Sequence, residues 1–173
     1  SDIDGHWGQS SMEALIQLGI LGGYANGNYG PDDDVTRAEF ATFLVRSLGL
    51  QAVEGPTPFK DVKENAWYYH NINTANYYGL VKGDNYGNFN PNAHITRQEM
   101  AVMLKRTLDH LNIEAPSMTF LFTDSNDIKA WAKSDIDYVV SLGLIGGMPN
   151  NRFAPLENTT RAQASVVIYR LIN

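Results

Sequence analysis

The sequence TRAE at Thr36–Glu39 recurs with one substitution each as TRQE at Thr96–Glu99 and as TRAQ at Thr160–Gln163. Thr followed three positions later by Glu or Gln is a capping box, in which each side chain accepts the backbone amide of the other residue at the start of an α-helix. Apolar residues follow each stretch at helical spacing, which predicts a helix with one core-facing stripe. The stripes are Phe40, Phe43, Leu44 and Leu48, then Met100, Met103, Leu104 and Leu108, then Ala164, Val167, Ile168 and Leu171.

The three capping boxes belong to a longer repeat that begins at a tryptophan. Trp7, Trp67 and Trp131 each precede the motif threonine by the same number of residues, without a gap. Two glycines and a proline recur at fixed distances after each Trp: Gly19, Gly79 and Gly143, Gly23, Gly83 and Gly147, and Pro31, Pro91 and Pro155. Such self-similarity indicates an array of small units that cannot fold singly. We place the repeats at 1–54, 55–116 and 117–173, together one structural unit that could stack in a line or close into a ring.

A second helix is predicted in each repeat, between the tryptophan and the first recurring glycine, at 7–18, 67–78 and 131–142. In the first copy its apolar positions are Met12, Leu15, Ile16 and Leu18. The recurring glycine stands where a glycine usually ends a helix. Turn-rich loops and proline-containing connectors separate the helices. The predicted fold class is therefore all-α, with six main helices and possible short extended pieces in the loops.

The composition limits the function. Hydrophobic residues make up 43% of the 173 residues, enough to form a real core. The net charge of −6 argues against a nucleic-acid partner, which usually requires a basic face. The absence of cysteine excludes disulfides and thiolate metal sites. No apolar run is long enough to insert in a membrane, and the chain begins without a signal peptide, as a processed or trimmed chain would.

The motif arginines are the strongest candidates for ligand binding. Arg37, Arg97 and Arg161 each fall at the first position of a predicted helix, where the helix dipole disfavours a cation. Their recurrence there suggests a compensating anion. Free N–H groups at a helix N-terminus and an adjacent guanidinium could together hold a carboxylate. The alternative is a structural salt bridge to Asp or Glu of the neighbouring repeat.

The pattern resembles the S-layer homology family over essentially the whole chain. The resemblance rests on an Asp-then-Trp opening, on Gly-Leu/Ile-x-x-Gly, on the TRAE-like motif, and on an aromatic-x-Pro at Tyr29–Pro31, Phe89–Pro91 and Phe153–Pro155. It implies three tandem two-helix repeats that close into a pseudo-threefold helical bundle with inter-repeat grooves. It also implies an extracellular module that anchors S-layer proteins or exoenzymes to a Gram-positive cell wall. The implied ligand is a secondary cell wall polysaccharide with a terminal pyruvyl-ketal N-acetylmannosamine.

The resemblance implies further ligand contacts from a loop glycine and from the Asp and Trp that open each repeat. Gly27 and Gly87 lie in such loops, where positive φ alone would also explain them, and the third repeat has Asn151 instead. Trp7, Trp67 and Trp131 could stack on a sugar or could anchor the core. Asp2, Asp61 and Asp124 could bind sugar hydroxyls or could cap the first helix or its preceding turn.

Because the third repeat also replaces Glu with Gln163, we expect two working grooves, in the repeats of Arg37 and Arg97, and a third that is mainly architectural. The alternative function is a structural or protein–protein module that mediates surface-layer assembly with neighbouring subunits. An enzyme is not expected, because no acid/base pair recurs. No cofactor or metal is expected either. The histidines do not recur at one repeat position and lack metal-ligand spacing: His6, His70, His94 and His110.

Overall fold

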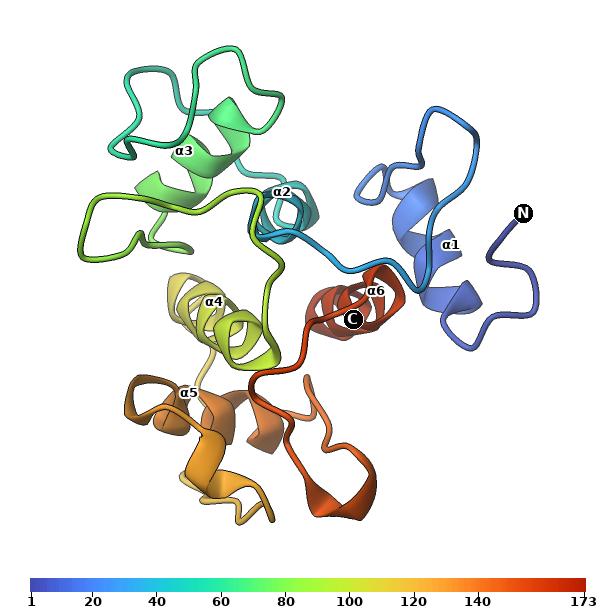
Figure 1. Ribbon diagram of the computed structural model, residues 1–173, viewed down its shortest axis with the longest axis vertical. Helices are drawn as coiled ribbons and strands as arrows, with labels where there is room; N and C mark the ends of the chain where they lie inside the picture. The colour runs from blue at the N-terminus through green and yellow to red at the C-terminus, as the bar shows by residue number, and fades with distance from the viewer.

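Three helices, α2, α4 and α6, form the centre of the computed structural model, and α1, α3 and α5 lie around them (Figure 1). The structure describes residues 1–173. The helices are α1 (Gln9–Gln17), α2 (Arg37–Ser47), α3 (Tyr69–Tyr77), α4 (Arg97–His110), α5 (Ala130–Ser141) and α6 (Arg161–Ile172). Two short 3₁₀ turns, Ser125–Asp127 and Pro149–Asn151, lie in the third repeat. The predicted all-α class is confirmed, and the only extended pairing consists of isolated bridges.

The helices of neighbouring repeats pack together. Helix α3 packs on α2, α5 packs on α4, and α1 packs on α6, while α2 also contacts α4 and α6. The first helix of each repeat therefore covers the second helix of the preceding repeat, and the first repeat covers the last. This cyclic exchange means that the chain forms a closed ring rather than a line (Figure 1).

A ring of backbone hydrogen bonds joins the extended segments before the three central helices. The amide of Val35 donates to the carbonyl of Thr159 at 2.8 Å, that of Ile95 to Val35 at 2.9 Å, and that of Thr159 to Ile95 at 3.0 Å. All three residues are buried. Because buried amides must be paired, these bonds fix the register of each repeat against its neighbour.

All three predicted capping boxes are present. The hydroxyls of Thr36, Thr96 and Thr160 accept the amide three residues on, and the side chain there accepts the threonine amide in return. The first two amides of each central helix are not free, however. In α2 the amide of Arg37 donates to the carbonyl of Ala93 at 2.9 Å and the amide of Ala38 donates to Pro91 at 3.0 Å. The expectation that these amides help to hold an anion is therefore wrong, because the neighbouring repeat occupies them.

The apolar stripes of the central helices are confirmed as core, with Leu48 and Leu171 only half-buried. In α1, Met12 and Leu15 are buried, but Leu18 is exposed because it lies just past the last helical turn. The glycine that follows each outer helix has positive φ, as predicted for a helix end. Helices α1 and α3 begin two residues after the tryptophan rather than at it, and α5 begins one residue before it. None of the six helices is long and apolar enough to cross a membrane.

Candidate functional site

Two grooves occupy equivalent positions between repeats, and each takes residues from all three. Each is lined by the loop and central helix of one repeat, by the motif arginine of the preceding repeat and by the tryptophan of the next repeat. Groove 1 has a volume of about 170 Å³ and is lined by Gly23, Tyr24, Glu39, Arg46, Trp67 and Arg161. Groove 2 has a volume of about 410 Å³ and is lined by Arg37, Gly83, Asp84, Glu99, Arg106 and Trp131.

The recurring tryptophans are surface residues. Trp7, Trp67 and Trp131 are 64%, 61% and 57% exposed, so the alternative that they anchor the core is wrong. Trp7 and Trp67 lie just before the outer helix begins and Trp131 lies in its first turn, so none of them belongs to the apolar stripe further along that helix. Trp67 and Trp131 line grooves 1 and 2. An exposed indole beside a polar groove offers a flat apolar face to a ligand.

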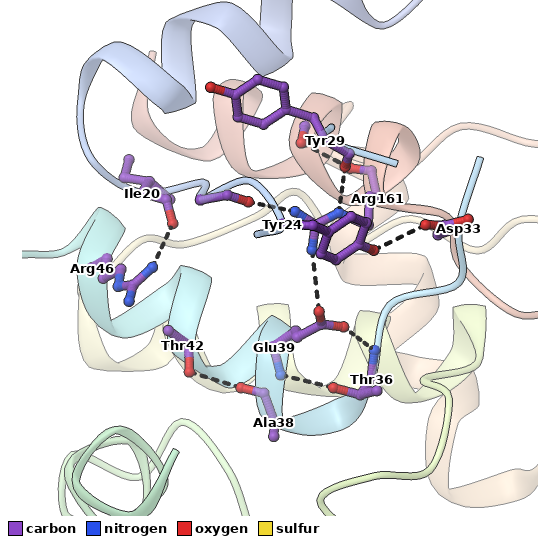
Figure 2. Close-up of polar contacts among 12 residues, drawn as sticks. Ile20, Tyr24, Tyr29, Asp33, Thr36, Ala38, Glu39, Thr42, Arg46 and Arg161 are labelled. Atoms are coloured by element: carbon purple, nitrogen blue, oxygen red, sulfur yellow. Dashed lines mark hydrogen bonds and ion pairs between the residues drawn. The ribbon is translucent and has the colours of Figure 1, made fainter. Parts of the chain in front are cut away.

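Groove 1 holds its arginine tightly (Figure 2). The side chain of Arg161 donates to the carbonyls of Tyr29 at 2.7 Å and Gly22 at 2.6 Å, and it forms a salt bridge with Glu39 at 3.1 Å. The guanidinium also lies 4.8 Å from the centre of the Tyr24 ring, which covers it. Only 4% of the Arg161 side chain is exposed. The structural salt bridge considered as an alternative is therefore present here.

Groove 2 leaves its arginine more open. Arg37 donates through Nε to the carbonyl of Phe89 at 2.9 Å and through Nη1 to Glu99 at 3.0 Å, but Nη2 has no protein partner. Asp84 stands where groove 1 has Tyr24, so the loop position that covers Arg161 has no ring here, and the Arg37 guanidinium instead lies 4.8 Å from the centre of the Phe89 ring. Partial burial lowers the pKa of Arg37, and Glu99 opposes that shift. Groove 2 thus combines a salt bridge with a free guanidinium donor.

The third position is built differently. Arg97 donates to the carbonyls of Phe153 and Gly146, both at 2.8 Å, but makes no salt bridge. Gln163 stands where the other two positions have the glutamate that pairs with the arginine. Arg97 is 5% exposed. The expectation that the altered groove belongs to Arg161 is wrong, because each arginine reaches the glutamate position of the next repeat and not that of its own.

A second set of recurring arginines escaped the sequence reasoning, although the same alignment on tryptophan contains it. Arg46, Arg106 and Arg170 occupy one repeat position near the end of the central helices. Arg46 donates to the carbonyl of Ile20 at 3.2 Å, and Arg170 donates to that of Leu144 at 3.3 Å. Arg46 and Arg106 line grooves 1 and 2, so each groove contains two guanidinium groups.

The recurring aspartates clamp the loop that ends each groove. The carboxylate of Asp61 accepts the amides of Phe89 and Asn90, both at 2.8 Å, and Asp2 and Asp124 make the equivalent pairs of bonds in their repeats. The alternative that they cap the first helix is wrong, since α1, α3 and α5 have no side-chain cap. The loop amides lower the pKa of Asp2. For Asp124, burial alone would raise the pKa, but the loop amides outweigh it and the net shift is downward.

Replacement of Asp124 by Asn is expected to lower the free energy of unfolding at pH 7 by about 1–2 kcal/mol, because an amide cannot accept both loop N–H bonds. The pKa of Asp124 is depressed in the folded state, so its stabilisation is present above the ordinary value of 3.8 and is lost as pH falls through the folded value. Urea unfolding between pH 7 and pH 3 should therefore show a smaller loss of stability for Asp124→Asn than for the native chain. Equal slopes in acid would contradict the clamp.

The predicted loop glycines do not line either groove. Gly27 and Gly87 have a φ of +84° at the tips of their loops, and Asn151 has a φ of +54° at the same repeat position. The glycines against the grooves are Gly23 and Gly83. At Gly83 an added Cβ would lie 2.7 Å from the carbonyl oxygen of Asn88, so close backbone packing explains this glycine.

The structure contains no group of three or more His, Asp or Glu side chains that could hold a metal ion. What it contains is a closed ring of three repeats with grooves that draw on all of them, which is the architecture of a repeat-built binding module. A family model described as the S-layer homology domain matches residues 1–41, 58–101 and 121–165. The chain belongs to this family.

Relatives confirm where such modules occur. The chain is 35% identical over 178 residues to an amylopullulanase of Thermoanaerobacterium thermosulfurigenes, a match that covers 99% of the chain and 9% of that protein. It is 35% identical over 169 residues to a surface-layer 125 kDa protein of Lysinibacillus sphaericus, covering 96% of the chain and 14% of that protein. It is 31% identical over 166 residues to an S-layer protein of Bacillus licheniformis, a match that covers 95% of the chain and 18% of that protein.

The chain therefore spans less than a fifth of the length of each of these relatives. The part shared with the amylopullulanase is the S-layer homology region, so that enzyme's activity does not extend to the module. The chain is a cell-wall anchoring module of the cell surface.

Proposed function

We propose that the module anchors its protein by binding a secondary cell wall polysaccharide that ends in pyruvyl-ketal N-acetylmannosamine, and that the ketal carboxylate lies in the grooves between repeats. The observation that carries this proposal is the Nη2 group of Arg37. It has no protein partner and belongs to a residue that lines a cavity of about 410 Å³. A guanidinium with free N–H donors suits a carboxylate, because the two groups form short, charge-assisted hydrogen bonds.

The acidic residues of groove 2 do not cancel this preference. Glu99 accepts Arg37 with one carboxylate oxygen and the amide and hydroxyl of Thr96 with the other. Asp84 accepts the amides of Tyr86 and Asn88 with one carboxylate oxygen and the side-chain amide of Asn90 with the other. The carboxylate oxygens are thus engaged, while a guanidinium donor remains available to a ligand. The groove therefore offers a hydrogen-bond donor, which favours a ligand group that accepts hydrogen bonds.

The exposed tryptophan supports a sugar rather than a small free anion. Trp131 lines groove 2 together with Arg37, and Trp67 lines groove 1 together with Arg161. An acidic sugar could place its carboxylate on the arginine and an apolar face of its ring on the indole. Groove 1 is the weaker site of the two in this proposal, since Tyr24 and Glu39 already cover Arg161. We assign the Arg97 position a mainly architectural role.

Titration calorimetry with matched saccharides tests the proposal. The native chain should bind the pyruvylated saccharide at least tenfold more tightly than the same saccharide after removal of pyruvate, because each tenfold corresponds to only about 1.4 kcal/mol and a charge-assisted pair supplies more. Binding should weaken as salt is raised. Equal affinity for the two saccharides would contradict the proposal that the grooves bind the ketal carboxylate. Formation of oligomers without glycan, seen by light scattering, would instead favour the assembly function.

A further inference from the structure

Arg106 differs from its two counterparts in having no hydrogen bond to the protein. At the same repeat position, Arg46 donates to the carbonyl of Ile20 and Arg170 donates to that of Leu144. The equivalent carbonyl in the second repeat belongs to Leu80, and Arg106 does not bond to it. Instead Arg106 lines groove 2.

No acidic side chain near Arg106 forms a salt bridge with its guanidinium group. Asp135 on α5 is the acidic group that raises the pKa of Arg106, yet it makes no salt bridge with Arg106, and burial raises the pKa of its own carboxyl group. Glu99 bonds to Arg37 and to its own helix cap. Burial is the main cause that lowers the pKa of Arg106; Asp135 opposes this shift, and the charge of Arg37 adds a smaller lowering. Two guanidinium groups with free donors therefore belong to one groove and repel each other when no ligand is bound.

We infer that Arg106 is a second ligand-binding residue, and that it makes groove 2 the tightest of the three inter-repeat sites for a sugar that carries a carboxylate. Arg37 and Arg106 then bind the acidic sugar together. This inference rests on the proposed function, because it concerns the same class of ligand. An anion between the two cations relieves their repulsion and satisfies donors that the protein leaves unpaired. Neither of the other two positions offers this pair, since Arg46 and Arg170 are already bonded to backbone.

Trp67 and Trp131 give grooves 1 and 2 separate reporters. The indole N–H resonances of Trp131, Trp67 and Trp7 can be followed separately by ¹H–¹⁵N NMR, after assignment with single Trp→Phe variants. On titration with the pyruvylated saccharide, the Trp131 resonance should shift at a ligand concentration about tenfold lower than the Trp67 resonance. Simultaneous shifts of the two resonances, or an earlier shift of Trp67, would overturn the ranking.

Arg106→Gln should raise the dissociation constant of the Trp131 site about tenfold and reduce its salt dependence. Arg106→Lys, which keeps the charge, should recover part of the affinity. The matched control is Arg170→Gln, which removes the equivalent arginine from the third repeat and should leave the Trp131 titration unchanged. The melting temperature of Arg106→Gln should stay near the native value, because the side chain has no hydrogen bond to lose.

The inference and the proposed function fail in different ways. If Arg106→Gln binds the pyruvylated saccharide as the native chain does, while removal of pyruvate still abolishes binding, Arg106 is not a ligand residue and the proposed function stands. If the native chain binds the saccharides with and without pyruvate equally well, both are wrong.

Discussion

Replacement of Arg161 by Ala is expected to lower the free energy of unfolding by about 3 kcal/mol, the largest loss of stability that we predict for a single side chain outside the apolar core. The change removes a salt bridge to Glu39 and leaves the carbonyls of Tyr29 and Gly22 without their donor. Arg161 opens the last helix and all these partners belong to the first repeat, so the loss acts on the closure of the ring. The melting temperature of a chain of this size should fall by roughly 10 °C.

Two variants make this prediction specific. Arg46→Ala removes an exposed arginine with a single 3.2 Å bond and should cost less than 1 kcal/mol, as surface changes usually do. Adding Glu39→Gln to Arg161→Ala should restore part of the stability, because the glutamate is otherwise left without its cation. Glutamine is tolerated at this repeat position, since Gln163 completes a capping box there. A further loss of stability in the double variant would contradict the argument.

Arg37→Gln is expected to weaken binding of the pyruvylated saccharide to groove 2 about 100-fold, the largest effect on binding that we predict. The substitution removes a charged donor from the site, and a hydrogen bond between charged groups is worth up to about 3 kcal/mol. Arg37 is more exposed than Arg161, with 13% of its side chain accessible, so the loss of stability should be smaller than for Arg161→Ala. Titration followed at the Trp131 indole resonance, which reports groove 2, and thermal unfolding of the same preparation separate the two effects.

Arg97→Gln is the matched control for Arg37→Gln, because it makes the same change at the same repeat position. Arg97→Gln should lower stability, because it removes the donor of one buried and one partly buried carbonyl bond, while binding in groove 2 should remain. If Arg97→Gln lost the binding and Arg37→Gln kept it, the assignment of the open groove would be incorrect.

The sequence predicted the helices and their caps well because these are local features. The capping boxes, the glycine after each outer helix and the apolar stripes depend on residues within one or two turns of each other. The position of the motif arginine at the start of a helix was predicted for the same reason. Its partners were not, because Arg37 contacts Phe89 and Glu99, which only the closed ring brings close.

Two features of the grooves were not predicted, for different reasons: the sequence left the exposure of the tryptophans open between two alternatives, and the second arginine position was missed. The exposure of Trp7, Trp67 and Trp131 depends on which side of the outer helix meets a neighbouring repeat, and a residue at the very start of a helix has no periodic neighbours that reveal it. The second arginine position was visible in the alignment of the repeats. It was overlooked because an arginine late in a helix has an ordinary explanation, namely a favourable interaction with the helix dipole.

The most direct test of the account is a crystal structure of the chain with the pyruvylated terminal sugar of the wall polysaccharide. We expect the sugar to occupy groove 2 first, with its carboxylate within hydrogen-bonding distance of Nη2 of Arg37 and its ring against Trp131. A sugar bound with its carboxylate in solvent, or bound at the Arg97 position while groove 2 stays empty, would contradict it.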